Sequence, residues 1–194
     1  MNDKERRPLK VILVGSSGVG KTSLINAYFG QPHENDTQPT VAPAYCGSTV
    51  ELKDKSTVDL QIWDTAGQEK FQSIGSMFYR ESDIAFICFD YQNKSTIQTW
   101  ISRVHAQVSD CIIFLVLTKS DLLTTDEEKE ILNQKNDLLN DMKAQEFFIT
   151  SASNKIGVSE LFYTAAQCIT TICKTSEPSS VAIKTRDNQN KGCC

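Results

Sequence analysis

A glycine-rich segment near the start of the chain has the residue types that bind phosphate. Residues 15–22 read GSSGVGKT and fill every fixed position of the pattern G-x-x-x-x-G-K-[ST]. Glycines allow backbone N–H groups to turn inward around an anion, and a helix that begins after Gly20 adds the positive end of its dipole. Lys21 supplies a point charge for the outer phosphates, and the Thr22 hydroxyl is placed to ligate Mg²⁺. The sequence therefore predicts that the chain binds a nucleoside phosphate.

A second set of residues could complete this chemistry. Asp64 ends an apolar stretch, where a carboxylate could help to hold Mg²⁺. Gly67 can offer its N–H to a terminal phosphate with no side chain in the way. The Gln68 amide can both donate to and accept from an attacking water. This set predicts hydrolysis of a nucleoside triphosphate.

A third set points to the base of the nucleotide. Residues 118–121, Thr-Lys-Ser-Asp, follow an apolar run, at the carboxyl edge where α/β sheets bind ligands. The Asp121 carboxylate can accept hydrogen bonds from N1–H and the 2-amino group of guanine, a pair that adenine cannot supply. Residues 151–153, Ser-Ala-Ser, could aim a backbone N–H at the base carbonyl. The predicted base is guanine.

These loops need a sheet to position them. Three unbroken apolar runs, residues 9–14, 84–89 and 111–117, are typical of parallel strands buried on both faces. Alternation across residues 50–63, interrupted by a turn, predicts a hairpin, and residues 147–149 give a short last strand.

Helical periodicity separates the strands. Apolar residues recur three and four apart in residues 97–108 and 158–172. Residues 125–128, Thr-Asp-Glu-Glu, read as a capping box that opens a further helix. The alternation predicts an α/β fold, with a six-stranded, mostly parallel sheet, one antiparallel edge strand and helices on both faces.

The composition favours one globular domain with a tail. The 194 residues are 40% hydrophobic and 23% charged, and the net charge of −4 argues against a nucleic-acid partner. No apolar run approaches the roughly 18 residues of a membrane span. The charged N-terminus lacks a secretory signal, and Asn2 excludes N-myristoylation, so the seven cysteines read as reduced cytosolic thiols apart from the terminal pair. We expect an extension at residues 1–8, the domain at 9–173 and, at 174–194, a polar tail that cannot bury enough surface to fold.

In this order, the motifs resemble those of the Ras-superfamily small GTPases, over roughly residues 8–173. The chain looks most like the Rab branch, because DLQIWDTAGQE at residues 59–69 and KFQSI at residues 70–74 are close to the Rab pattern. The terminal Cys193 and Cys194 resemble the double-cysteine end that carries two geranylgeranyl groups in Rab proteins. The resemblance implies a P-loop small GTPase fold and a switch between GTP and GDP. Such a switch hydrolyses GTP slowly without an activating protein and regulates vesicle trafficking.

The resemblance also implies residue roles by position. Thr40 would be the switch I threonine that binds Mg²⁺ and the γ-phosphate, Thr22 a permanent Mg²⁺ ligand, and Asp64 a residue that acts on the metal largely through water. The implied catalytic residues are Gln68, Lys21 and Thr40. The implied nucleotide-binding residues are Gly15, Ser16, Ser17, Gly18, Val19, Gly20, Lys21, Thr22, Ser23, His33, Thr40, Gly67, Thr118, Lys119, Asp121, Ser151, Ala152 and Ser153.

The implied partners are a guanine-nucleotide exchange factor, a GTPase-activating protein, a GDP-dissociation inhibitor, the prenylation machinery and effectors. Lipid on Cys193 and Cys194 would attach the protein to a membrane, because two chains anchor stably where one is marginal. The tail's net charge of +2 is too small for a polybasic patch. We expect a monomer that cycles between the cytosol and the cytosolic face of an internal membrane.

Several positions depart from the family pattern. Ser16 replaces a common Asp, Thr118 replaces the Asn of N-K-x-D, and Ser153 replaces the Lys of S-A-K. His33 stands where most members place a Phe edge-on to the guanine, so we expect faster nucleotide release. Residues 41–45, Val-Ala-Pro-Ala-Tyr, differ from the usual I-G-V-D-F, which indicates an unusual choice of effectors.

Two other functions stay open at this point. A GTP-binding scaffold that hydrolyses little and acts as a docking platform would fit the altered switch and base loops, although Gln68 and Thr40 argue against it. A P-loop kinase or ATPase fits poorly, because Asp121 favours guanine and no arginine-rich lid insert is visible.

Overall fold

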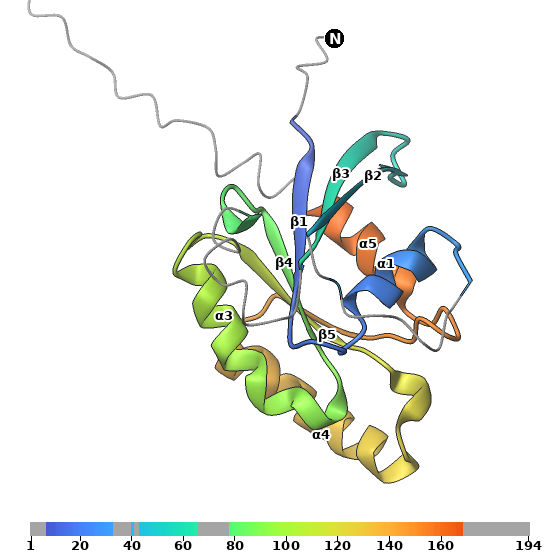
Figure 1. Ribbon diagram of the computed structural model, residues 1–194, viewed down its shortest axis with the longest axis vertical. Helices are drawn as coiled ribbons and strands as arrows, with labels where there is room; N and C mark the ends of the chain where they lie inside the picture. The colour runs from blue at the N-terminus through green and yellow to red at the C-terminus, as the bar shows by residue number, and fades with distance from the viewer. Residues whose placement is uncertain (1–6, 33–39, 41–42, 66–77, 169–194) are drawn as a thin grey trace, which may run out of the picture.

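A single six-stranded sheet organises the computed structural model, which describes residues 7–32, 40, 43–65 and 78–168 (Figure 1). The strands are β1 (Leu9–Val14), β2 (Ala44–Glu51), β3 (Thr57–Asp64), β4 (Ile84–Phe89), β5 (Ile112–Leu117) and β6 (Glu146–Ile149). Their order in the sheet is β2-β3-β1-β4-β5-β6. β2 pairs antiparallel with β3, whereas β1–β3, β1–β4, β4–β5 and β5–β6 are parallel pairs. The predicted sheet, with its one antiparallel edge strand, is confirmed.

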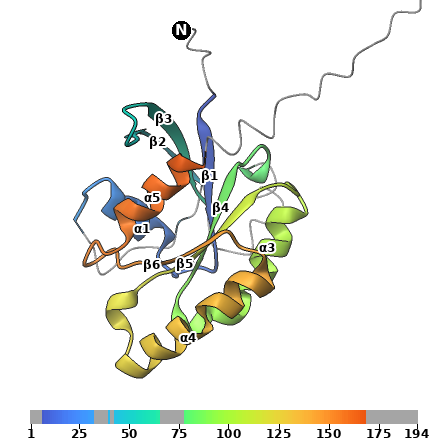
Figure 2. The same cartoon turned by 180° about the vertical axis from the view of Figure 1, so that it is seen from behind.

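Helices cover both faces of the sheet (Figures 1 and 2). The helices α1 (Lys21–Tyr28) and α5 (Val158–Gln167) pack on one face, and α3 (Ile97–His105) and α4 (Thr125–Met142) on the other. Successive residues of β1 accordingly divide between two cores: Val11 and Leu13 pack under α1 and α5, while Ile12 and Val14 pack under α3 and α4. Burial on both faces is why this strand is an unbroken apolar run.

Several boundaries differ from those predicted. The hairpin strand β2 begins at Ala44, because its pairing with β3 continues to the register pair Ala44↔Asp64, beyond the alternating residues that revealed it. The cap of α4 is Thr124, not Thr125. Its hydroxyl accepts from the N–H of Glu127 at 3.3 Å, and the Glu127 carboxylate accepts from the N–H of Thr124 at 2.8 Å. Both threonines precede a Glu by three residues, so the spacing alone could not choose between them.

The described part of α5 ends at Gln167, so the rest of the helix predicted to residue 172 lies outside the described residues. Cys111 precedes β5 rather than opening it. Among the described residues, no helix is long and apolar enough to cross a membrane.

Candidate nucleotide-binding site

The loop between β1 and α1 has a backbone that only glycine can follow. Gly20 caps α1 with a φ of 103°, and Gly18 has a φ of 76°. At Gly15, whose φ is 150°, a Cβ atom would lie 2.1 Å from the carbonyl oxygen of Cys88 on β4. The loop is therefore pressed against the sheet at its start and turns directly into the N-terminus of α1, which favours an anion there.

Lys21 is buried within this loop. Its Nζ donates to the carbonyl oxygens of Gly15 at 2.8 Å and Ser16 at 3.0 Å, and the residue is 5% exposed. Desolvation by this burial lowers the pKa of Lys21. An anion bound in the loop would offset that cost by stabilising the charged ammonium group.

Three predicted metal ligands come together beside Lys21. The Thr22 hydroxyl donates to Oδ2 of Asp64 at 2.6 Å, and Oγ1 of Thr40 lies 2.7 Å from Oγ1 of Thr22. Oδ1 of Asp64 is buried and has no hydrogen-bond partner in the described structure. Burial raises the pKa of Asp64, against the lowering effects of Thr22 and Lys21.

An unpartnered buried carboxylate oxygen beside two hydroxyls fits a hard cation such as Mg²⁺, which takes oxygen ligands and retains several waters. The described residues contain no cluster of three or more His, Cys, Asp or Glu that could hold a metal ion. A cation here would therefore depend on hydroxyls, one carboxylate, water and the ligand's own phosphates.

The loop after β5 is tied directly to the phosphate loop through Thr118. Its buried Oγ1 lies 2.6 Å from the carbonyl oxygen of Val19 and 3.0 Å from that of Phe89, so its one proton can serve either. The next residue, Lys119, adopts a left-handed conformation with a φ of 56°, and its Nζ is 3.0 Å from Oδ2 of Asp90. Thr118 thus performs a connecting role despite its departure from the common Asn.

The loops after β5 and β6 meet at Asp121. The Ser151 hydroxyl donates to Oδ1 of Asp121 at 2.5 Å, and itself accepts from the N–H of Asn154 at 3.0 Å. The N–H of Ser151 donates to the carbonyl oxygen of Ile156, so this residue cannot offer it to a base. Within the described chain, that leaves the N–H groups of Ala152 and Ser153 for the predicted base contact.

The remaining predicted residues divide into three groups. Ser17 and Gly18 are exposed at the tip of the phosphate loop, and Ser23 follows Thr22 in the first turn of α1. The Ser16 hydroxyl accepts from the indole N–H of Trp100 at 3.4 Å. Outside the described residues lie His33, Gly67, Gln68, Cys193 and Cys194.

Sequence reasoning missed Asp90. Its carboxylate accepts from the N–H of Asn93 at 3.0 Å, which caps the short 3₁₀ helix η2 (Tyr91–Thr96), and it also pairs with Lys119. Burial acts to raise the pKa of Asp90, but the hydrogen bonds to Asn93 and Lys119 together outweigh it, so the pKa is lowered. An Asp that follows a buried strand and precedes Asn by three residues was a signal for such a cap.

The fold and site together define a P-loop protein that binds a nucleotide where the carboxyl ends of β1, β5 and β6 meet. The family model of the Ras family matches residues 10–171. The chain is 33% identical to the Ypt/Rab-type GTPase YPT7 of Saccharomyces cerevisiae, over 84% of this chain and 81% of the relative. It is 34% identical to the GTP-binding protein YPTC5 of Chlamydomonas reinhardtii over 100% of both chains, and 37% identical to the Ras-related protein Rab-17 of Mus musculus over 81% and 74%.

The chain therefore belongs to the Ras family and is a Rab-like small GTPase. It binds guanine nucleotides and hydrolyses GTP. A role in vesicle trafficking is typical of this branch.

Proposed function

We propose that Thr22, Thr40 and Asp64 hold a Mg²⁺ ion whose presence, together with GTP, defines the active state of the switch. The observation that carries this proposal is the contact of one hydroxyl, Thr22 Oγ1, with both Thr40 and Asp64. When bound, Mg²⁺ neutralises charge on the β- and γ-phosphates. Asp64 is suited to accept a hydrogen bond from a metal-bound water, because its Oδ1 has no other partner among the described residues.

Side chains and backbone groups of the protein bind the phosphates and orient the attacking water. Lys21, already fixed between two loop carbonyls, contacts the outer phosphates. Gly67 offers its N–H to the γ-phosphate, and Gln68 orients the attacking water. Residues 30–43 contain no arginine, so this loop supplies no cation to the developing charge and unassisted hydrolysis is slow.

Thr40 is the residue whose contacts at the site depend on which nucleotide is bound. Thr22 and Asp64 belong to α1 and β3, whereas Thr40 reaches the same point from the long loop between α1 and β2. The hydroxyl of Thr40 therefore gains partners at the site when γ-phosphate and metal are present and loses them after hydrolysis. Such ordering of a loop by the γ-phosphate is an established form of switching in GTPases.

Asp121 selects guanine, with Ser151 fixing one of its oxygens and Thr118 fixing the loop against Val19. The orientation of the carboxylate depends on both loops, because Asp121 belongs to the loop after β5 and its hydrogen-bond donor Ser151 to the loop after β6. The N–H groups of Ala152 and Ser153 complete recognition at the base carbonyl.

An exposed aromatic group beside the site offers a surface for effectors. The rings of Tyr45 and Trp63 lie 5.3 Å apart and those of Trp63 and Phe78 lie 5.6 Å apart, and Tyr45 is 53% exposed. Aromatic residues are enriched in protein interfaces. Trp63 is the residue before Asp64 at the end of β3, and the two side chains point to opposite faces of the sheet. The further partners are an exchange factor, a GTPase-activating protein, a GDP-dissociation inhibitor and the prenylation machinery. The protein acts on the cytosolic face of internal membranes.

Nucleotide binding by Thr40→Ala in the presence and absence of EDTA tests the metal site. We expect the variant to lose the GTP-specific part of its affinity, about tenfold or more for one charge-assisted contact, while GDP binding changes little. Thr49→Ala, an exposed threonine on β2, is the matched control. Equal loss of GTP and GDP affinity in Thr40→Ala would contradict the proposed role.

A further inference from the structure

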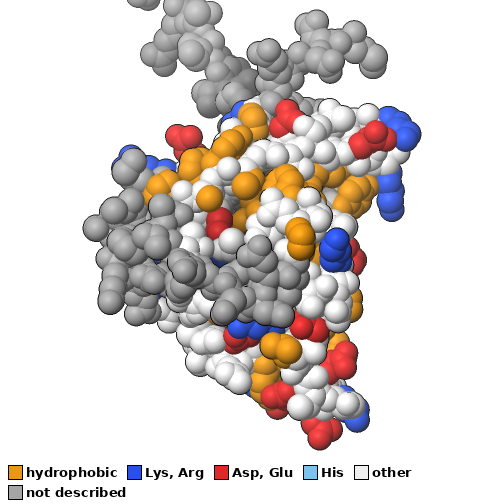
Figure 3. All heavy atoms as spheres, turned by 45° about the vertical axis from the view of Figure 1, so that its right-hand side comes forward, with side chains coloured by type: hydrophobic (Ala, Val, Ile, Leu, Met, Phe, Trp, Pro, Cys, Tyr) orange, Lys and Arg blue, Asp and Glu red, His pale blue; other side chains and the backbone are white. Residues whose placement is uncertain are grey.

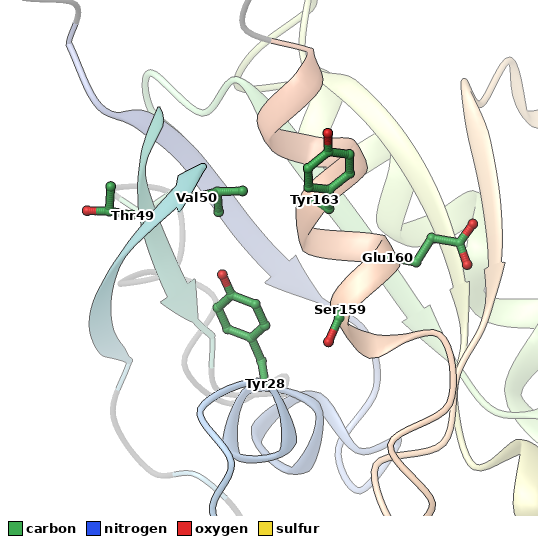
Figure 4. A pocket seen from close by; sticks show the side chains of 6 residues that line it. All are labelled: Tyr28, Thr49, Val50, Ser159, Glu160 and Tyr163. Atoms are coloured by element: carbon green, nitrogen blue, oxygen red, sulfur yellow. The ribbon is translucent and has the colours of Figure 1, made fainter. Parts of the chain in front are cut away.

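An apolar groove lies on the molecule away from the nucleotide site. It has a volume of about 540 Å³ and is lined by Tyr28, Thr49, Val50, Ser159, Glu160 and Tyr163. In Figure 4, Tyr28 points from α1 into the space between β2 and α5, Val50 points toward α5, and Glu160 points outward. Figure 3 shows apolar side chains gathered on this face, below the charged side chains of the hairpin.

The walls of the groove are held in place by contacts of their own. The Tyr28 ring stacks on Phe162 with centroids 4.0 Å apart, and its hydroxyl is 2.8 Å from Oγ of Ser48. The Tyr163 hydroxyl accepts from the N–H of Lys53 at 3.2 Å. The groove is thus a fixed feature between three elements.

One side of the groove is an open strand edge. β2 is the first strand of the sheet, and no strand in the described part of the chain pairs with its outer edge. The N–H of Leu52 donates to Ser56 opposite it, and hydrogen-bonded pairs alternate along an antiparallel ladder. The backbone groups of Gly47, Thr49 and Glu51 therefore face outward, where another strand could bond to them.

We propose that the triplet Val181-Ala182-Ile183 of this chain's own tail docks in the groove as a strand added to β2. Val181 and Ile183 are the only branched aliphatic residues between Lys174 and Cys194. They are two residues apart, so in a strand they point to the same face, here toward Val50 and the tyrosines, while Ala182 points away. Both are β-branched, which favours the extended form.

The length of the tail permits this docking. Cys168, the last described residue, is five residues beyond Tyr163, or about 8 Å along α5. The thirteen residues from Cys168 to Val181 reach up to about 43 Å when extended. The contact of Tyr163 with Lys53 places this part of α5 beside the hairpin, so the tail approaches from that end and runs antiparallel to β2.

Hydrogen exchange of the full chain, loaded with GDP, tests the docking. We expect the outward-facing amides of Gly47, Thr49 and Glu51 to exchange at least about twofold faster in the tail variant Val181→Asp/Ile183→Asp than in the wild type. In the wild type the tethered triplet would protect them at an effective concentration in the millimolar range. The charge-matched control is Thr175→Asp/Ser176→Asp, in the same tail but outside the triplet. It should match the wild type.

A second variant tests the groove itself. Ser159→Trp adds a bulky side chain at an exposed groove position and should raise the exchange of the amides of Gly47, Thr49 and Glu51 as the tail variant does. Asn136→Trp, on the exposed side of α4 on the opposite face, should not. Equal exchange in the wild type and both test variants would overturn the proposal, as would an equal effect of the control variants. Protection that rises with protein concentration would assign the groove to the tail of another copy and overturn docking within one chain.

The docking is independent of the nucleotide chemistry. No groove residue is among those placed at the nucleotide site, and Tyr28 lies at the opposite end of α1 from Lys21. We therefore expect the tail variant to hydrolyse GTP at the wild-type rate. If the proposed metal site is wrong, only the nucleotide-binding experiment will contradict it. If the proposed tail docking is wrong, only the hydrogen-exchange experiment will contradict it.

Discussion

The hydroxyl of Ser151 donates a 2.5 Å hydrogen bond to Oδ1 of Asp121, joining the loop after β6 to the loop after β5. The carboxylate that we propose for guanine is therefore aimed by a residue from a different loop. The same hydroxyl accepts from the N–H of Asn154, so its proton is directed toward Asp121 rather than toward solvent.

Removal of the Ser151 hydroxyl should weaken binding of the guanine base. Ser151→Ala leaves the Asp121 carboxylate without its partner, and a hydrogen bond to a charged group is worth about 1.5 to 3 kcal/mol. We expect GDP to dissociate about tenfold faster or more, measured by displacement of a fluorescent GDP analogue, and selection of guanine over adenine nucleotides to weaken. Asp121→Asn should weaken that selection further. Ser109→Ala, an exposed serine far from these loops, is the control, and wild-type selectivity in Asp121→Asn would refute the assignment.

Gly15 should tolerate no side chain. A Cβ there would meet the Cys88 carbonyl at 2.1 Å, and the φ of 150° is itself unfavourable for other residues. Gly15→Ala should lower the free energy of unfolding by about 2 to 5 kcal/mol, as strain and overpacking combine. At Gly47 a Cβ would instead lie 3.3 Å from the mobile end of Tyr45, so Gly47→Ala should change stability by less than about 0.5 kcal/mol. Urea unfolding measures both, and equal effects would contradict the argument.

We expect the Asp64 carboxylate, which we propose for metal binding, to lower the free energy of unfolding of the metal-free protein. Burial raises its pKa above the ordinary value of 3.8, so between those two values the folded state binds more protons than the unfolded state. The cost of burying the charged carboxylate is absent below pH 3.8, grows as the pH rises from 3.8 to the raised pKa, and is complete above that pKa. Asp64→Asn should therefore stabilise the metal-free, nucleotide-free protein at pH 7, and the gain should vanish below pH 3.8, where the carboxylate is protonated in both the folded and the unfolded state.

Urea unfolding between pH 3 and pH 7 measures this difference. The control is Asp59→Asn on the same strand, where the carboxylate is exposed and bonds only to Thr49 among the described contacts. A gain from Asp64→Asn that is the same at every pH would show that charge burial is not its cause.

Gln68 should govern the rate of hydrolysis. No arginine lies in residues 30–43, and unassisted enzymes of this kind turn over at roughly 10⁻⁴ to 10⁻³ s⁻¹. Gln68→Leu should lower the single-turnover rate by at least about tenfold and hold the protein with GTP bound, because leucine cannot orient a water. Gln92→Leu, exposed at η2, is the control. An unchanged rate in Gln68→Leu would remove this residue from the mechanism and favour a scaffold role.

The sequence predicted those strands and loops whose positions depend on local residue spacing and on burial. The apolar runs of β1 and β4 and the fixed positions of the phosphate loop follow from rules that apply within a few residues, and the structure has them where they were expected. Thr124 could not be chosen over Thr125, since both satisfy the same local spacing. The N–H of Ser151 could not be known to bond to Ile156, and Asp90 could not be known to meet Lys119, because these contacts arise only when distant loops gather at one sheet edge.

The terminal cysteines should decide where the protein resides. Two lipid chains anchor a protein stably, whereas one chain is marginal, and the tail's net charge of +2 adds little attraction to an anionic surface. We expect the full chain to partition with membranes when it is expressed in a eukaryotic cell with intact prenylation. Deletion of Cys193 and Cys194 should move it to the cytosol, and substitution of one of them should give an intermediate distribution. Substitution of the buried Cys168, which cannot accept a lipid in the folded protein, controls for loss of a thiol. Equal membrane association of the full and truncated chains would refute the lipid anchor, because no described helix could replace it as a membrane span.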